Sequence, residues 1–164
     1  MPFQLKRQSA KVAHLNVREE KHGEESVVAV DVKVQADVGN ELLDSLSPGL
    51  REAFYAKEEG GLGGVDPAFS VLRFPQLAPL HWEETIAACE FTVHGAKRAD
   101  DLAFTGEVAK PLVLSVKEGG TVSLTLQVQI RPDATELGAL SSFLGRSTKV
   151  TLRPAEQPPA PPAE

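Results

Sequence analysis

The clearest structural signal in this chain of 164 residues is the stretch VAVDVKVQAD at residues 28–37. Its apolar residues recur at every second position, so that one face of an extended chain would be apolar and the other largely polar. A second stretch, VSLTLQVQIR at residues 122–131, has the same pattern. Both predict β-strands with one buried and one solvated face, which is typical of an antiparallel sheet covered on one side.

Each of these strands has a hairpin partner before it. Residues 15–23 lead into the first strand through a turn that ends at Gly23, and residues 112–120 lead into the second through Gly119 and Gly120. Glycine supplies the positive φ angles that a tight hairpin needs. Further strands are expected at residues 91–93 and 148–153.

Helix signals follow both hairpins. Asn40 is a candidate N-cap of one helix, and Pro48 is expected in the first turn of a second helical piece. In the second half of the chain, either Asp133 or Thr135 is expected to cap a helix that Gly145 ends. The sequence therefore predicts an α+β fold, in which an antiparallel sheet is accompanied by two or more helices.

The two halves of the chain look alike, which suggests a duplicated strand–turn–strand–helix unit. The halves would be residues 11–57 and 89–153, joined by a Gly/Pro-rich segment at 58–80 and forming one α+β domain over 1–153. Amphipathic strands before amphipathic helices are common, so the likeness also has a simpler explanation. Residues 154–164 contain five prolines and no large apolar residue, and they are expected to form a disordered tail.

The predicted core consists of the apolar positions that these patterns turn inward. They are Leu15, Val17, Val28, Val30, Val32, Val34, Leu42, Leu46, Leu114, Val116, Leu124, Leu126, Val128, Leu137, Leu140 and Leu144.

The overall composition points to a soluble protein without a membrane segment. No apolar run approaches the roughly 20 residues of a transmembrane helix, and the first ten residues lack the apolar region of a secretory signal. Cys89 is the only cysteine, which fits a reducing cytoplasm. The net charge is 17 − 23 = −6, so the chain as a whole does not attract nucleic acid.

The first 18 residues are an exception to the acidic charge. They contain four cations and no acid: Lys6, Arg7, Lys11 and Arg18. On a strand that begins near Lys11, Val12, His14, Asn16 and Arg18 would share one solvated face. This stretch is interpreted either as a solvated arm or as a nucleic-acid contact formed by the four cations.

An apolar run inside the Gly/Pro-rich segment is the candidate for contact with a protein partner. Its large side chains at Phe69, Leu72, Phe74 and Leu77 lie between prolines, where no regular core element is expected. Packing of these side chains within the chain is the favoured interpretation.

The sequence contains no catalytic or metal-binding motif, so a non-enzymatic protein without a cofactor is predicted. The four histidines are scattered, and His81 and Glu83 have H-x-E spacing without the later pair of thiolates that a zinc deaminase needs. Cys89 and His94 lie close enough for a nucleophile and its base, but a buried, inert cysteine is the favoured interpretation. The glycines at 60–64 match no nucleotide-binding loop.

Several motifs resemble a group of small uncharacterised proteins from tailed bacteriophages and prophages. They are LNVREEKHG at 15–23, VDV at 30–32, KEGGTV at 117–122, QVQ at 127–129 and LG at 137–138. The resemblance covers most of residues 11–153 and departs at 96–110. It implies a phage or prophage origin, a bacterial cytoplasm and a role near replication, recombination or control of the host, and it offers no catalytic residues.

Three classes of function follow from these observations. The first is a non-enzymatic phage or prophage protein that binds another protein, either a host factor or a phage replication or recombination component. The alternative is a single-stranded DNA-binding or recombination accessory protein, and an enzyme has the least support. The sequence leaves a homo-oligomer open.

Overall fold

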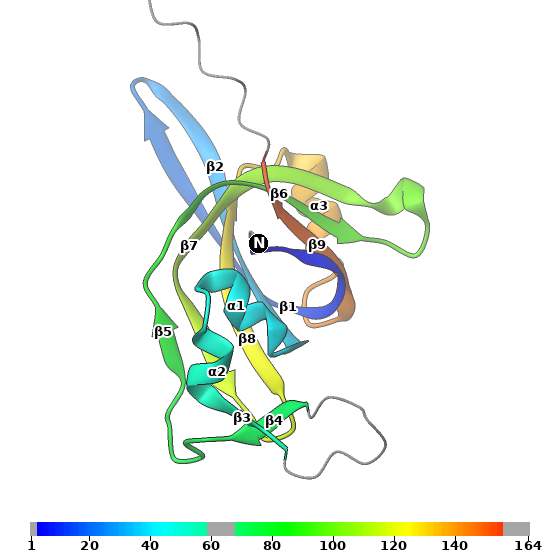
Figure 1. Ribbon diagram of the computed structural model, residues 1–164. Coiled ribbons are helices and arrows are strands. Elements are labelled where there is room, and N and C mark those ends of the chain that lie inside the picture. Colours follow the sequence, from blue (N-terminus) through cyan, green and yellow to red (C-terminus); the bar gives the residue numbers. More distant parts are fainter. Residues whose placement is uncertain (1–2, 59–67, 156–164) are drawn as a thin grey trace, which may run out of the picture.

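The computed structural model describes residues 3–58 and 68–155 (Figure 1). Of these residues, 59% lie in strands and 15% in helices. The elements, in chain order, are β1 (Leu5–His22), β2 (Glu25–Gly39), α1 (Glu41–Leu46), α2 (Leu50–Phe54), β3 (Tyr55–Lys57), β4 (Phe69–Leu72), β5 (Leu80–Trp82), β6 (Ile86–His94), the 3₁₀ turn η2 (Arg98–Asp100), β7 (Leu102–Val116), β8 (Thr121–Ile130), α3 (Ala134–Ser141) and β9 (Ser147–Pro154).

Both alternating stretches form the strands expected of them. The stretch at 28–37 lies in β2 and the stretch at 122–131 forms most of β8, and the two strands pair antiparallel from Val30 opposite Ile130 to Gly39 opposite Thr121. The strands expected at 91–93 and 148–153 are also present, as parts of β6 and β9.

The sheet closes on itself. Its strand order is β5-β7-β6-β9-β1-β2-β8, and β7 also pairs with β8, so that six antiparallel strands form a barrel with β5 added outside the ring. The expected α+β fold, an antiparallel sheet with two or more helices on it, is therefore wrong: the protein is a mostly-β closed barrel with additional strands.

Helices cover little of the sheet because they are too short. α1 has six residues, α2 five and α3 eight. The apolar faces of the strands instead face one another inside the barrel, where Val32 of β2, Phe91 of β6 and Val128 of β8 are all at most 1% exposed. Within the ring, closure gives every strand two neighbours as well as burying the apolar faces.

The helix caps agree with the sequence only in part. Asp133 caps α3 through a capping box with Glu136, whereas Asn40 precedes α1 without a side-chain cap and donates instead to the carbonyl of Phe69 (2.6 Å). Pro48 lies in the turn before α2, not in its first turn. Gly145 (φ 77°) lies in the turn after α3, four residues beyond the end of the helix.

A β-bulge in β1 changes which side chains face inward. Val12 is opposite Val34 and His14 is opposite Lys33, so Ala13 is an extra residue in β1. Val12 is consequently fully buried while His14 is exposed. The expected solvated face that would contain both Val12 and His14 is therefore wrong.

The β1–β2 hairpin extends beyond the barrel as an arm, at the upper left of Figure 1. Pairing of β1 with β9 ends at Lys11, and pairing of β2 with β8 ends at Val30, but β1 and β2 stay paired as far as His22 and Glu25. Because no further strand of the described residues pairs with the arm, Val17 is 53% exposed and Val28 44%. Both were expected in the core, and so was Leu144, which is 47% exposed.

The other predicted core positions are buried or pack against the buried cluster. The expected flexible glycine loop lies largely in residues 59–67, and the expected disordered tail largely in residues 156–164. Both of these ranges are outside the described part of the chain.

Candidate functional site

The predicted partner-binding segment divides into a packed part and an exposed part. Phe69 and Leu72 belong to β4 and pack against the core. Phe74 and Leu77 follow β4 and are 54% and 42% exposed. Internal packing, the favoured interpretation, therefore describes Phe69 and Leu72 but not Phe74 and Leu77.

The exposed part is held in place by hydrogen bonds of the backbone. The Arg73 amide donates to the Phe54 carbonyl (2.9 Å), and the Leu77 amide donates to the Phe74 carbonyl (3.1 Å). The Arg73 guanidinium adds a bond to the Glu52 carbonyl (2.9 Å). Phe74 and Leu77 are thus presented on a fixed backbone beside α2.

The packed part is also anchored on several sides. The Phe69 ring lies 4.8 Å from the Arg51 guanidinium carbon and 5.2 Å from the Lys57 nitrogen, and both cations lie over its face. The Gly119 amide, in the β7–β8 turn, donates to the Ser70 carbonyl (2.9 Å). β4 is therefore joined both to the α2–β3 region and to the β7–β8 hairpin.

The four cations predicted as a nucleic-acid contact do not form one surface. Lys6 and Arg7 are exposed at an irregularity where β1 pairs with β9. Lys11 lines a concavity of about 530 Å³ on the outer face of β1, β2 and β8, and Asp37 also lines it. Arg18 lies on the arm opposite Ala29 and is held by carboxylates.

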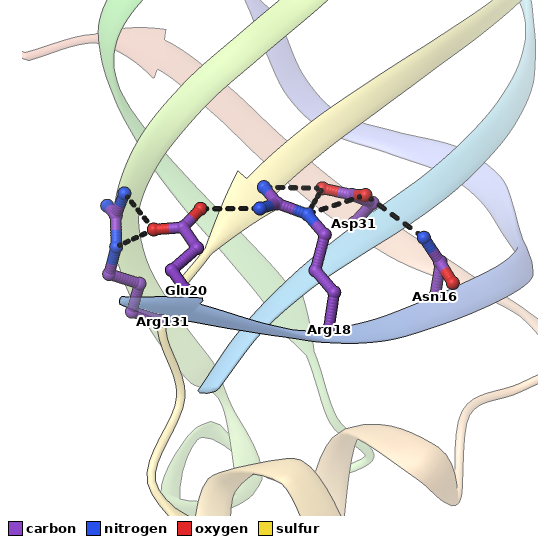
Figure 2. A network of polar contacts seen from close by, with 5 residues as sticks. All are labelled: Asn16, Arg18, Glu20, Asp31 and Arg131. Atoms are coloured by element: carbon purple, nitrogen blue, oxygen red, sulfur yellow. Dashed lines mark hydrogen bonds and ion pairs between the residues drawn. The ribbon is translucent and has the colours of Figure 1, made fainter. Parts of the chain in front are cut away.

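Figure 2 shows the polar network that holds Arg18. Its guanidinium is 3.1 Å from Asp31 Oδ2 and 2.6 Å from Glu20 Oε1, and Glu20 Oε2 is 2.9 Å from Arg131 Nη2. Asn16 donates to Asp31 (3.3 Å). The Asp31 side chain is only 9% exposed, so these donors compensate a largely buried carboxylate. The network joins β1, β2 and the end of β8 at the base of the arm.

Cys89 and His94 do not form a nucleophile and base. Both lie on β6, but Cys89 faces the barrel interior, where burial raises the pKa of its thiol to about 11. His94 is an odd number of residues away and faces outward. The interpretation of Cys89 as a buried, inert cysteine agrees with this placement.

His94 instead joins a cluster that the sequence did not indicate, here called the His94 clasp and formed by His94, Asp101 and Thr151. His94 Nδ1 is 2.9 Å from Asp101 Oδ2, and Nε2 is 2.7 Å from Thr151 Oγ1. The hydrogen bond with His94 is the main cause that holds the pKa of Asp101 below its usual value. The other Asp101 oxygen accepts from the Gly95 amide (3.0 Å), and the Arg7 amide donates to Thr151 Oγ1 (3.1 Å).

The order carboxylate, imidazole and hydroxyl is the one that activates nucleophiles in hydrolases. In this chain the three groups tie the loop after β6 to β9 and to the irregular part of β1, where Arg7 has a positive φ of 41°. Neither His94 nor Thr151 lines the neighbouring cleft. The clasp therefore acts as an anchor for the β6–β7 loop.

That cleft, here called the α3 cleft, lies between the β6–β7 loop and the connection from α3 to β9. Its volume is about 610 Å³. Five loop residues line one side of the cleft: Gly95, Ala96, Ala99, Asp100 and Leu102. The opposite side is lined by Ala139 of α3, Phe143 and Arg146, among others. The sequence alone does not indicate this cleft, because its walls come from segments far apart in the chain.

Within residues 3–58 and 68–155, no group of three His, Cys, Asp or Glu side chains could hold a metal ion. None of the helices in the same residues could span a membrane. Comparison of the chain with protein-family models, with curated proteins and with solved structures finds no match.

Proposed function

We propose that this chain is a non-enzymatic protein that acts by binding another protein through the exposed part of the 69–77 segment. The observation that carries the proposal is the exposure of Phe74 and Leu77 on a backbone fixed by hydrogen bonds. Of the six large hydrophobic side chains that are exposed in the described residues, three lie in this segment: Val71, Phe74 and Leu77. A concentration of exposed apolar side chains is typical of a protein contact.

The resemblance of the 15–23 and 117–122 motifs to proteins of tailed phages supports a phage or prophage origin. The partner is then a host factor or a component of phage replication or recombination, and the contact takes place in the bacterial cytoplasm. An apolar surface on the partner would complete the burial of the Phe74 ring.

The test is affinity capture of the tagged chain from a bacterial host, with and without nuclease treatment. Wild-type chain is compared with the double variant Phe74→Ser, Leu77→Ser. We expect the wild type to capture a partner protein even after nuclease treatment. The double variant should capture at least about tenfold less of this partner, since central apolar anchors carry much of the binding energy.

The variant Leu144→Ser is the matched control, because Leu144 is equally exposed but lies after α3. It should capture the partner as the wild type does. Substitutions at exposed positions change stability by only about 0.5 kcal/mol, so all three chains should fold. Equal capture by the wild type and by the double variant would exclude this segment as the contact.

Single-stranded DNA binding is the second candidate function, and Lys11 favours it because it lines the concavity on the outer face of the barrel. The net charge of −6 and the engagement of Arg18 by Asp31 and Glu20 oppose it. We expect no measurable binding of a single-stranded oligonucleotide at about 0.15 M salt. Tight, salt-sensitive binding that disappears when Lys6, Arg7 and Lys11 are changed to Glu would favour DNA instead.

A further inference from the structure

We propose that the α3 cleft binds a ligand that carries a carboxylate beside an apolar side chain. A free apolar amino acid and the C-terminal residue of a polypeptide both have this chemistry. The volume of about 610 Å³ lies in the range of small-molecule sites. The cleft shares no residue with the 69–77 segment, so the proposal does not depend on the proposed function.

The apolar part of the cleft accounts for the apolar side chain. Leu102 and Phe143 line it and also pack against the buried core, so their positions are fixed from behind. Ala139 of α3 and Ala96 and Ala99 of the loop add small apolar surfaces. Small residues around two larger ones leave room for a side chain such as that of leucine or valine.

The charged part of the cleft accounts for the carboxylate. Arg146 lines one side and Asp100 the other, and in the described chain neither side chain forms a hydrogen bond or an ion pair. A guanidinium offers paired N–H donors that match the two oxygens of a carboxylate. Asp100 can accept only, so it suits the amide N–H of a terminal residue or the ammonium of a free amino acid.

Three hydroxyl-bearing residues line the cleft, Ser142, Ser147 and Thr148, and two of them already donate their protons within the chain. Ser142 donates its proton to the Ala139 carbonyl (2.6 Å), and Thr148 donates to the His94 carbonyl (2.6 Å). Both protons are therefore used within the chain. Arg146 is the cationic donor among the residues that line the cleft.

The loop side of the cleft is held in advance of binding. The His94 clasp anchors Asp101, which also accepts from the Gly95 amide. Gly95 approaches Asp100 so closely that an added Cβ would lie 2.4 Å from the Asp100 Cβ. Because this backbone is already fixed, the loop would lose little conformational entropy when a ligand binds.

The test is a titration of ¹⁵N-labelled full-length chain, followed by NMR, with N-acetyl-leucine, leucine and N-acetyl-leucinamide. The last probe lacks the carboxylate and is the matched control. We expect saturable binding of at least one carboxylate probe with a Kd of about 1 mM or below, with shifts at residues 95–102 and 139–148. The amide should bind about tenfold more weakly or not at all.

The two carboxylate probes distinguish the two sources of the ligand. Tighter binding of leucine than of N-acetyl-leucine would indicate a free amino acid, with its ammonium on Asp100. Tighter binding of N-acetyl-leucine would indicate the end of a polypeptide. Either result supports the cleft as a carboxylate site.

Arg146→Gln should weaken binding of the carboxylate probes about tenfold. Lys97→Gln, in the same loop but outside the lining, removes the same charge and should leave the affinity unchanged. Three results would overturn the proposal. The wild type could bind the acid and the amide probes with equal affinity, the two variants could bind the carboxylate probes with equal affinity, or no resonances of the cleft could shift. The comparison of probes on the wild type does not require the Arg146 variant to fold.

Discussion

Gly106 of β7 lies so close to β8 that there is no room for a side chain. A Cβ at this residue would lie 2.1 Å from the backbone oxygen of Gln129 and 3.0 Å from Ile130 Cγ2. Gly106→Ala must therefore push two paired strands apart, and we expect it to lower the free energy of unfolding by about 1–3 kcal/mol. Thermal unfolding followed by circular dichroism measures the effect.

Gly138→Ala is the control for that experiment. Gly138 lies inside α3, and an added Cβ would meet no heavy atom within 4 Å. Alanine favours a helix over glycine by up to about 1 kcal/mol, so this variant should keep or raise the Tm. A Gly106→Ala protein as stable as the wild type would contradict the close approach of β7 and β8.

The buried thiol of Cys89 should make the folded chain less stable in alkaline solution. Burial raises the pKa of its thiol from 9.0 to about 11 in the folded chain. Its contribution to stability is therefore complete below about pH 9 and is lost as the pH rises towards 11. In urea unfolding between pH 7 and 11, Cys89→Ala should lose less stability above pH 9 than the wild type does. Parallel curves for the two proteins would mean that the thiol is not buried.

At the scale of residues, the sequence predicts the burial of a side chain where its residue type decides it. It does not predict contacts that depend on which strands pair and in which register. The residue type alone predicts that Cys89 is buried, and it is 1% exposed. Phe74 and Leu77, for which internal packing is the favoured interpretation, are exposed. The engagement of Arg18 does not follow from its neighbours in sequence. It depends on the β1–β2 register, which places Asn16 opposite Asp31 and brings Arg18 beside the same carboxylate.

At the scale of elements, the start of α3 can be tested, because the sequence offers both Asp133 and Thr135 as its N-cap. Asp133 accepts from the Glu136 amide (2.7 Å), and Glu136 in return accepts from the Asp133 amide (3.0 Å). Asp133→Ala should therefore cost about 1 kcal/mol of stability in urea unfolding. Thr135→Ala, at the other residue predicted as the cap, should change stability by less than about 0.5 kcal/mol. A larger cost at Thr135 would place the start of the helix elsewhere.

The bulge at Ala13 explains why a clear alternation can still assign faces wrongly. Period-two reasoning carries the face of one residue to every second position along the strand. One extra residue between Val12 and His14 reverses that assignment, so the apolar Val12 enters the barrel and His14 stays outside. Alternation predicted β2 and β8 correctly over the stretch where they pair without interruption.

At the scale of the whole molecule, alternation predicts one buried face per strand but not what covers it. Helices on an open sheet and a sheet closed on itself satisfy the same pattern. The decision depends on pairing between distant segments, such as β1 with β9, and on the shortness of the helices. The α3 cleft was beyond sequence reasoning for the same reason, since closure and the α3–β9 connection bring its walls together.

Closure of the barrel is the central claim, because it determines which residues face outward and so where every candidate surface lies. Amide hydrogen exchange followed by NMR tests it most directly. A closed ring gives each of its six strands two neighbours, so amides on both sides of each strand should exchange slowly within the barrel. The β7–β8 seam, with Leu114 opposite Leu124, completes the ring and should be protected. The β6–β9 seam, with Phe91 opposite Leu152, and the β2–β8 seam, with Val34 opposite Leu126, should be protected with it. Fast exchange at every second amide along one of these seams would mean an open sheet and would contradict the account.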